Sequence, residues 1–333
     1  MTVLIVTAHD DDTATRVCDA LHRRARDHLR IDLGDFPDTL SLSATGPDPG
    51  WTGTLHDGHR ELALDDVEAV YWRWPTTFRM PDHLDPQQRR FAVAEARQGL
   101  GGIISCLPVP FVSHPARIAD AELKPAQLHT AAQLGLLVPP TLITSDGQAA
   151  REFVRRHRRV LYKPFTATFL RTEDRTKLVY ATLIDSPAEI DDAAVALAPC
   201  QFQAFITKRH DVRLTVVGTV CLAVAIHAGS DPAYVDWRAD YPSLTYQTVP
   251  TPDPIATAVT GYLDRFGLAS GCFDFTVDHD NRWWFLECGA NAQWGWLEHE
   301  TGAPIADAIA RRLTTARPAP ITGPPGAPGR RTA

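Results

Sequence analysis

Two carboxylates stand out near the C-terminal end of the sequence because each interrupts an apolar run. Asp274 lies between two phenylalanines, and Glu287 follows the run Trp283–Leu286. The polar residues 278–281 separate the two runs, so the segment predicts a β-hairpin. With an even number of residues in the loop, period-two alternation places Asp274 and Glu287 on one face, diagonally related across the strand pair. An odd loop would separate them.

Two carboxylates that face one another among apolar residues repel and lose hydration. They therefore need raised pKa values or a bound cation. Magnesium is commonly held by one or two carboxylates together with phosphate oxygens, so the hairpin predicts a magnesium site. The alternative is structural: one acid lies at a solvated edge, and the other forms a salt bridge.

Four basic residues also interrupt apolar elements. Lys124 precedes a helix, Lys163 ends the apolar run VLYK, and Arg213 and Arg238 lie in DVRLTVVG and DWR. A triphosphate with its metal requires this inventory, because cations spread over the phosphate oxygens while carboxylates hold the magnesium. Each residue alone is more often structural, and Lys124 alone would be a solvated surface lysine. The order and spacing of all six favour the nucleotide hypothesis.

Composition excludes several function classes. The 333-residue chain of 36.7 kDa has a net charge of -7, which gives no electrostatic footprint for nucleic acid. Its six cysteines show no C-x-x-C spacing, which argues against a zinc site or a disulfide framework and is typical of a reducing cytoplasm. The N-terminal apolar run lacks a signal-peptide pattern, and no run reaches membrane-spanning length. We expect a cytoplasmic protein without a membrane or nucleic-acid partner.

The first 115 residues alternate strand and helix patterns, which predicts an open, mostly parallel βα sheet. No glycine-rich phosphate loop follows the first strand, so a dinucleotide site is not supported. Arg73 lies between two tryptophans, where packing on aromatic faces is expected rather than a ligand contact. The predicted strands are Val3–Thr7, Leu29–Leu33 and Val67–Trp74, and the predicted helices are Thr13–Asp27 and Gln87–Ile104.

The run Phe111–Pro115 breaks this pattern and predicts a domain boundary. We expect a domain of residues 1–115, a central subdomain 116–198, a C-terminal subdomain 199–315 with the metal site, and a Pro/Gly-rich disordered tail 316–333. The fold class is therefore α/β and α+β. Beyond the boundary the patterns predict helices Pro125–Leu134, Pro187–Ala198, Pro254–Phe266 and Ile305–Leu313, strands Val160–Lys163, Leu178–Ile184, Cys200–Ile206, Asp211–Gly218, Val220–His227 and Leu244–Val249, and a mobile loop or loose hairpin at Thr166–Lys177.

With these residues in place, the sequence resembles the ATP-grasp ligases. Within them it is similar to the ribosomal peptide maturases that make graspetides, the microviridin-like ester- and amide-crosslinked peptides. The resemblance covers nearly the whole chain, and its most specific parts are the run Phe111–Thr144 and the closing QWGW. It implies an ATP-grasp fold with an N-terminal open βα (pre-ATP-grasp) domain, ATP and Mg²⁺ as cofactors, and a ribosomal precursor peptide with leader and core as partner.

The resemblance also assigns roles. Lys124 and Lys163 match the family's two nucleotide-phosphate lysines, and the hinge segment whose backbone meets adenine matches Gln203, Ala204, Phe205 and Ile206. The arginines near the γ-phosphate and the acyl-phosphate match Arg213 and Arg238. Two of the three magnesium ligands match Asp274 and Glu287.

The third magnesium ligand departs from the family pattern. A Glu-x-Asn pattern would place asparagine at position 289, where this chain has Gly289. Either Asn291 supplies the ligand, or water fills the position, because Mg²⁺ commonly keeps several waters. A third alternative is that catalysis is weakened or lost. The loop after Lys163 also lacks the glycines that many ATP-grasp enzymes place over the phosphates.

Three functions remain open at this stage. The first is a peptide macrocyclase that activates Asp or Glu side chains of a precursor as acyl-phosphates and forms intramolecular esters or amides. The second is another ATP-grasp ligase, which adds an amino acid to a peptide or protein. The third is a non-catalytic peptide- or nucleotide-binding homologue. A homodimer is left open, because two-fold oligomers are common among soluble enzymes.

Overall fold

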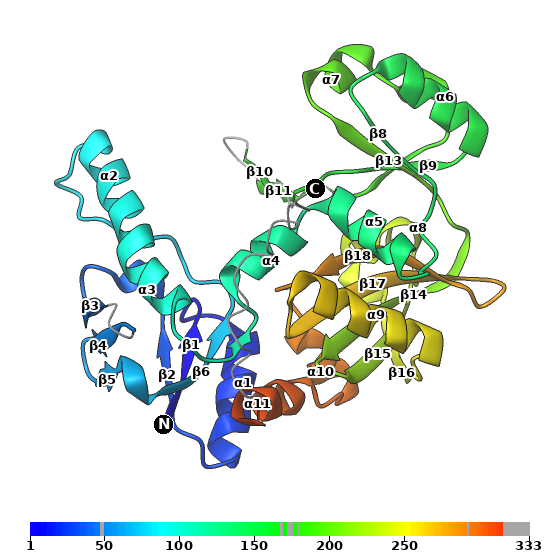
Figure 1. Ribbon diagram of the computed structural model, residues 1–333. Coiled ribbons are helices and arrows are strands. Elements are labelled where there is room, and N and C mark those ends of the chain that lie inside the picture. Colours follow the sequence, from blue (N-terminus) through cyan, green and yellow to red (C-terminus); the bar gives the residue numbers. More distant parts are fainter. Residues whose placement is uncertain (47–49, 167–168, 172–175, 179, 292, 316–333) are drawn as a thin grey trace, which may run out of the picture. The chain divides into compact units, whose positions relative to one another are not determined.

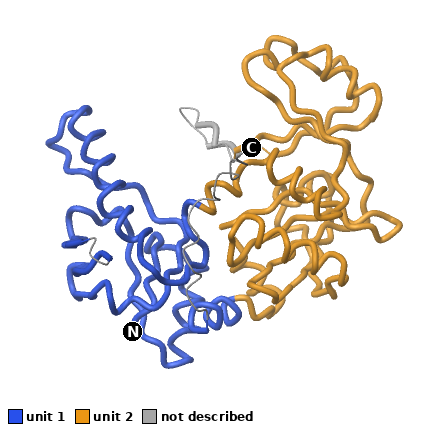
Figure 2. Tube along the Cα trace, in the orientation of Figure 1, with its two compact units in different colours: residues 1–116, 306–333 blue, residues 117–305 orange. Residues whose placement is uncertain are grey.

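The structure, a computed structural model, describes residues 1–46, 50–166, 169–171, 176–178, 180–291 and 293–315. The chain divides into two compact units (Figure 2): residues 1–116 with the segment from Ala306, and residues 117–305. In the part of the chain that is described, no helix is long and apolar enough to cross a membrane.

The first unit is built on a parallel sheet with strand order β2-β1-β6-β7 (Figure 1). The central strand β1, Thr2–Val6, is buried along its whole length, as its apolar sequence predicts. The order reverses at β1, because the chain continues first to β2 on one side and later to β6 on the other. The predicted open parallel sheet is confirmed.

A second, antiparallel sheet of three strands, β3-β4-β5, was not predicted, because its strands are short and their residues are mostly polar. The predicted helix Gln87–Ile104 is helical throughout but changes type, with a π-helical turn between two α-helices. The elements of this unit are β2 His28–Ile31, β3 Ser41–Thr45, β4 Thr52–His56, β5 Glu61–Ala63, β6 Val67–Trp72, β7 Phe111–Val112, α1 Asp12–Arg23, α2 Pro86–Ala96, the π-helical η3 Arg97–Gly101, α3 Gly102–Ser105, and the 3-10 helices η1 Leu33–Asp35 and η2 Leu64–Asp66; α11 spans Ile305–Thr315 and belongs to this unit from Ala306.

Arg73 is a buried structural residue, as expected from its aromatic neighbours. Its guanidinium lies 5.4 Å from the ring centre of Trp74, and its Nε donates to Asp11 at 2.6 Å. Asp11 also caps helix α1 by accepting from the backbone N–H groups of Thr13 and Ala14. The pair therefore ties the end of β6 to the start of α1.

The described residues of the second unit contain three antiparallel sheets. Their strand orders are β12-β9-β13-β8, β16-β15-β14-β17-β18, and the two-stranded pair β10-β11. The elements are β8 Thr141–Thr144, β9 Val160–Lys163, β10 Phe169–Arg171, β11 Thr176–Leu178, β12 Thr182–Ile184, β13 Cys200–Ala204, β14 Lys208–Val217, β15 Val220–His227, β16 Thr245–Val249, β17 Ser270–Asp278, β18 Trp283–Gly289, α4 Pro115–Ala121, α5 Lys124–Gln133, α6 Gly147–His157, α7 Asp192–Leu197, α8 Asp231–Val235, α9 Asp253–Phe266, α10 Gly295–Thr301, and the 3-10 helices η4 Pro187–Glu189, η5 Trp237–Ala239 and η6 Tyr241–Ser243.

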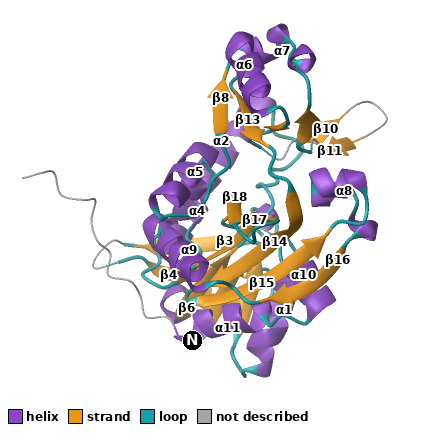
Figure 3. Cartoon of the chain, turned by 90° about the vertical axis from the view of Figure 1, so that its right-hand side faces the viewer, coloured by secondary structure: helices purple, strands orange, loops and turns teal. Residues whose placement is uncertain are grey.

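The five-stranded sheet has one apolar face and one polar face. Helices α5 and α9 pack against strands β17 and β18 (Figure 3), and Tyr262 of α9 contacts Phe273 and Phe285. The predicted alternation in β14 is confirmed, because Val212 and Leu214 are buried while Arg213 points to the opposite face.

The hairpin formed by β17 and β18 corrects our expectation about its register. Its ladder closes at Val277 and Trp283, which leaves an odd loop of residues 278–282. A β-bulge between Phe285 and Glu287 adds Leu286 to one strand and restores the register. Asp274 and Glu287 are consequently direct partners, not diagonal ones.

Several boundaries differ from the sequence expectations. The break between the units follows Ala116, and α11 is grouped with the first unit, although we expected it to end the C-terminal subdomain. The separation of 116–198 from 199–315 stays a prediction. The predicted loop Thr166–Lys177 and strand Leu178–Ile184 are described in part, as the paired strands β10 and β11 and as β12. Their residues 167–168, 172–175 and 179, and the predicted tail 316–333, lie outside the described residues.

The Asp11–Arg73 pair predicts a pH-dependent contribution to stability. Burial alone would raise the pKa of Asp11, but the hydrogen bond and charge of Arg73 outweigh burial and lower it. A carboxylate with a lowered pKa stabilises the fold above its unfolded pKa of about 3.9. This stabilisation is lost as the pH falls through the pKa of the folded state. Asp11→Asn should therefore reduce the free energy of unfolding by about 3 kcal/mol at pH 7. Denaturant titrations should show this difference shrinking below about pH 4.

The matched control is Asp19→Asn, an exposed carboxylate on the same helix. It should change the free energy of unfolding by less than about 0.5 kcal/mol. A difference for Asp11→Asn that stays constant between neutral and acidic pH would contradict the assignment.

Candidate active site

Three strands place a row of charged side chains on the polar face of the five-stranded sheet. Arg213 of β14 pairs in register with Asp274 of β17, which in turn pairs with Glu287 of β18. The guanidinium of Arg213 donates to both Asp274 oxygens, at 2.9 and 3.1 Å. The guanidinium also lies 5.1 Å from the ring centre of Trp237. The row is fixed by backbone pairing, so its spacing does not depend on loops.

Lys124 reaches this row from the first turn of α5. Its Nζ donates to Glu287. The helix is anchored by Gln127, one turn further on, whose buried side-chain amide contacts both backbone groups of Cys288, at 2.8 and 3.0 Å. Because Cys288 follows Glu287 directly, this amide holds the helix start beside the carboxylate. Lys124 and Glu287 thus come together although they are 163 residues apart.

Arg238 approaches the same carboxylate from the 3-10 helix η5. Its Nη1 lies 3.7 Å from Glu287, and its other nitrogens bind Asp236 at 2.9 and 2.8 Å. Asp236 also caps η5 by accepting from the N–H of Arg238 and receives the N–H of Ala181. Asp236 therefore orients Arg238, a role that the sequence reasoning missed.

Lys163 lies at the end of β9, and its Nζ donates to the side chain of Gln203 at 3.3 Å. Gln203 is buried between β8 and β9 and donates to Thr141 at 3.0 Å. The predicted hinge continues from this residue. The N–H groups of Ala204 and Phe205 donate to the carbonyls of Pro140 and Arg159. In the described part of the chain, the N–H of Ile206 donates to no backbone carbonyl.

The predicted third metal ligand stays a prediction. Asn291 lies in the turn that follows β18. Gly289 pairs with Cys272 and, by alternation, points to the same face as Glu287. Its backbone is an ordinary strand conformation, since Gly289 is absent from the glycines with positive φ among the described residues. Backbone freedom is therefore not what requires glycine at this position.

The electrostatics of the acid pair are uneven. Burial and the neighbouring charge of Glu287 raise the pKa of Asp274 against the opposing effect of Arg213. Burial would also raise the pKa of Glu287, but the charges of Lys124, Lys163 and Arg238 outweigh it and lower that pKa. Burial lowers the pKa of Lys163. The site is thus a dense set of opposite charges in which Asp274 is the least favoured as an anion.

A cavity of about 40 Å³ lies among these side chains, and it includes residues that the sequence analysis did not select. Lys208 and Asp211 form a buried ion pair of 2.6 Å on β14. The second oxygen of Asp211, Oδ1, is buried without a hydrogen-bond partner in the described structure. The sequence pattern Lys-x-x-Asp-x-Arg could have indicated Asp211 as a site residue, because alternation places Asp211 on the same face as Arg213.

The donor set fits a hard divalent cation. Asp274 and Glu287 are opposed carboxylates, which is the ligand type that Mg²⁺ prefers. The raised pKa of Asp274 indicates that additional positive charge would be favourable beside it. Elsewhere in the described chain, His9, Asp32 and Asp35 lie within 4.8 Å of one another. There Asp32 already accepts from the backbone and hydroxyl of Thr76, which makes that cluster a structural connection.

Comparisons with known proteins agree with the fold. A comparison with curated proteins gives no match. The family described as the MvdD pre-ATP grasp domain matches residues 2–119. A solved RiPP-associated ATP-grasp ligase of Chryseobacterium gregarium, in complex with ADP and a leader and core peptide, is 24% identical with a TM-score of 0.87 and covers 94% of this chain and 96% of its own. Residues 2–119 thus form an MvdD pre-ATP-grasp domain, and the chain as a whole has the ATP-grasp fold.

Two further solved structures show the same fold. The macrocyclase MdnC of Microcystis aeruginosa, bound with precursor peptide MdnA, is 27% identical with a TM-score of 0.83, and the match covers 95% of this chain and 100% of the MdnC chain. The ATP-grasp ligase PsnB, complexed with minimal precursor, Mg and ADP, is 22% identical with a TM-score of 0.73 and covers 94% and 96%. The predicted fold class and N-terminal pre-ATP-grasp domain are confirmed, and the residue roles remain predictions.

The anchoring role of Gln127 can be tested directly. Gln127→Met keeps the side-chain volume but leaves the buried N–H and C=O of Cys288 without partners. The free energy of unfolding should fall by about 2 kcal/mol. Because Lys124 would also lose its fixed position, affinity for Mg-ADP should fall in calorimetric titration. The control is Gln133→Met, an exposed residue of the same helix, and equal effects of the two substitutions would refute this role.

Proposed function

We propose that this ligase uses ATP to activate Asp or Glu side chains of a ribosomal precursor peptide and then closes ester or amide crosslinks within that peptide. The observation that carries the proposal is the row Arg213–Asp274–Glu287, with Lys124 and Arg238 at one end of it. This row supplies cations for phosphate oxygens and carboxylates for a divalent metal on one rigid surface.

Each charged residue has a distinct task in this proposal. Asp274 and Glu287 would hold Mg²⁺, with Asn291 or water completing the ligand set. The metal would supply positive charge that neutralises the phosphate oxygens. Lys124 and Lys163 would bind the nucleotide phosphates, and Ile206, at the end of the hinge, keeps an N–H available for the adenine edge.

The two arginines would act on the reacting groups. Arg213 is fixed by Asp274, and Arg238 is fixed by Asp236, so neither side chain must be ordered when the substrate arrives. They would stabilise charge on the transferred phosphoryl group and on the acyl-phosphate of the peptide. A hydroxyl or amine of the same peptide would then attack the acyl carbon and release phosphate, with no covalent intermediate on the protein.

The surrounding aromatic residues support a site that excludes water. Trp237, Tyr241 and Trp296 contact one another with ring centres 5.4 to 5.8 Å apart, and Trp237 also contacts Arg213. An acyl-phosphate hydrolyses if water reaches it, so an apolar wall beside the arginines favours attack by the peptide. Trp294, two residues before Trp296 in the run QWGW, is also buried.

The proposal is tested by incubating the purified ligase with Mg-ATP and a precursor peptide encoded beside its gene. Mass spectrometry should show loss of one water per crosslink, with ADP formed in parallel. Lys163→Met should reduce turnover by about 100-fold or more, because the phosphate loses a fixed cation. Arg155→Met, on the exposed side of α6, is the charge-matched control. Addition of an amino acid mass would support a different ligase, and binding without turnover would support a non-catalytic protein.

Gly289→Asn tests the metal assignment separately. Gly289 pairs with Cys272 in the strand ladder, and alternation directs a side chain at this position to the face of Glu287. We expect a several-fold gain in Mg²⁺ affinity, measured by calorimetry with ADP present, because an amide oxygen replaces a water. Gly218→Asn, in the turn between β14 and β15, serves as a distant control. A loss of Mg²⁺ affinity in Gly289→Asn would show that the metal does not lie on this face.

A further inference from the structure

A cavity of about 390 Å³ opens in the first unit, at the carboxyl end of its parallel sheet. Its lining includes Leu33, which follows β2, and Trp72, the last residue of β6, together with residues of the segment after β6. Ligands of open α/β sheets bind outside the carboxyl ends of the strands. The volume also falls within the range of about 300–1,000 Å³ that is typical of ligand sites.

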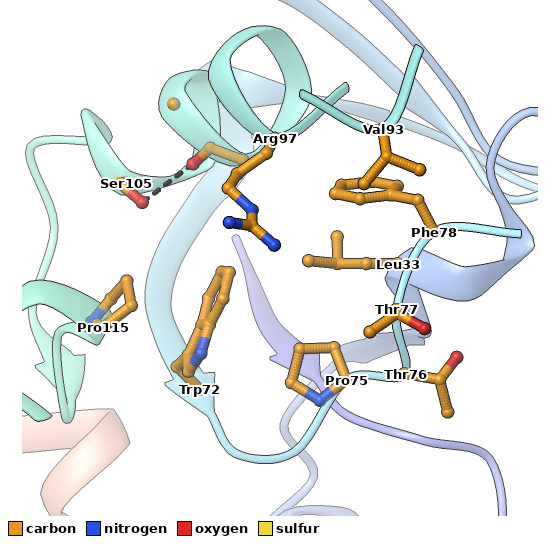
Figure 4. A pocket seen from close by; sticks show the side chains of 12 residues that line it. Leu33, Trp72, Pro75, Thr76, Thr77, Phe78, Val93, Arg97, Ser105 and Pro115 are labelled. Carbon is orange, nitrogen blue, oxygen red and sulfur yellow. Dashed lines mark hydrogen bonds between the residues drawn. The ribbon is translucent and has the colours of Figure 1, made fainter. Parts of the chain in front are cut away.

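The walls of this cavity are mainly apolar. Figure 4 shows Trp72, Phe78 and Leu33 around the opening, with Val93 of α2 above them. We call it the Arg97 cavity, defined by its lining residues Leu33, Trp72, Pro75, Thr76, Thr77, Phe78, Val93, Arg97, Gly101, Gly102, Ser105 and Pro115. No lysine or carboxylate occurs in this lining.

Arg97 is the one charged residue of the lining. Its guanidinium points into the cavity, toward Trp72 and Leu33 (Figure 4). Across the described residues, this guanidinium makes no hydrogen bond and no ion pair, whereas Arg89 of the preceding turns binds the carbonyls of Met80 and Pro81. Arg97 is exposed to solvent, and a solvated cation that points into an apolar cavity is suited to an anionic group of a ligand.

The helix that carries Arg97 has an unusual local structure. Residues Arg97–Gly101 form a π-helical turn, a feature that is frequent at functional sites. Gly101 ends this turn and Gly102 follows it, and a Cβ built on either would meet no atom within 4 Å. Helical glycines each cost up to about 1 kcal/mol relative to alanine. This segment therefore leaves open space beside the cavity at the expense of helix stability.

From these observations we infer that the Arg97 cavity binds an apolar side chain of a peptide while Arg97 pairs with a neighbouring carboxylate of that peptide. The inference rests on the proposed function, because a peptide rich in Asp or Glu is the substrate that function requires. The single cation distinguishes this cavity from a polyphosphate site, which needs several cations. It would act as a recognition site for acidic peptide segments, separate in its residues from the site at Asp274 and Glu287.

The test uses the full-length ligase without ATP and a peptide with one apolar side chain and one acid, acetyl-Gly-Gly-Phe-Asp-Gly-Gly-amide. Binding is followed through the indole N–H signal of Trp72 in NMR spectra, assigned with Trp72→Phe. At about 1 mM peptide, a weak but specific site should be measurably filled. Exchanging Phe for Ser, or Asp for Asn, in the peptide should weaken binding by about fivefold.

Two matched pairs of variants locate the site. Arg97→Glu should weaken binding about fivefold or more, whereas Arg90→Glu, an exposed residue of α2, should not. Gly102→Leu should block the cavity, whereas Gly99→Leu should not, because Gly99 also has open space around its Cβ but does not line the cavity. Unchanged circular dichroism and ADP binding would show that all four variants are folded.

Failure of this inference is distinguishable from failure of the proposed function. If the wild-type ligase crosslinks its precursor, but the Arg97→Glu and Arg90→Glu variants bind the test peptide equally well, only the cavity assignment is overturned. An undisturbed Trp72 signal also overturns it. If the peptide binds in an Arg97-dependent way but no precursor is crosslinked, the cavity is supported and the proposed chemistry is wrong.

Discussion

The site depends on the register of one strand pair. Asp274 and Glu287 can share a cation only if β17 and β18 place them on the same face, and a one-residue slip would move Glu287 to the apolar side. The odd loop at 278–282 would cause such a slip, and the bulge at Leu286 compensates for it. The apolar face enforces the same register, because Phe273, Phe275 and Phe285 must all pack toward α9. Core packing and site geometry are therefore two results of one ladder.

The charges at the site are held by partners that are themselves fixed. Arg213 contacts Asp274 and Trp237, and Arg238 is held by Asp236. The position of Lys124 is fixed because Gln127 attaches α5 to β18. Without ligand, opposite charges pair with one another, so the buried groups are not left uncompensated. A phosphate or metal that enters must exchange these pairs, which favours ligands that bring both signs of charge, as a metal-bound triphosphate does.

Sequence reasoning predicted the elements with strong periodicity and the residues that stand out against them. Strand β9 at Val160–Lys163 and strand β15 at Val220–His227 were predicted to the residue, because each is a continuous apolar run. The six charged site residues were chosen because each interrupts such a run. The bulge at Leu286 was not predictable, since the turn and the strand each fit more than one register.

Other residues were missed because their role depends on a distant partner. Gln127 looks like an ordinary polar position on a helix, and only the fold shows that its amide meets Cys288. Lys208 lies in the polar run before the predicted strand and Asp211 begins that strand, and in the fold the two are buried as an ion pair. The strands β3–β5 were missed because their residues lack a continuous apolar pattern. Where backbone pairing or long-range contacts decide a side chain's environment, local sequence carries little information.

The attachment of α5 has a consequence for strand addition. Strand β18 is an edge strand of its sheet. Its outward backbone groups are nevertheless occupied, because Gln127 binds the backbone of Cys288 and the carbonyl of Leu137 accepts a hydrogen bond from the N–H of Phe285. Exposed strand edges invite pairing with extended segments of other chains. Because β18 is already engaged at both positions, the sheet offers such a segment its opposite margin, β16, where Thr245 and Gln247 are exposed. Any β-augmentation of this sheet should occur there, at the opposite edge of the five-stranded sheet from β18, the strand of Glu287.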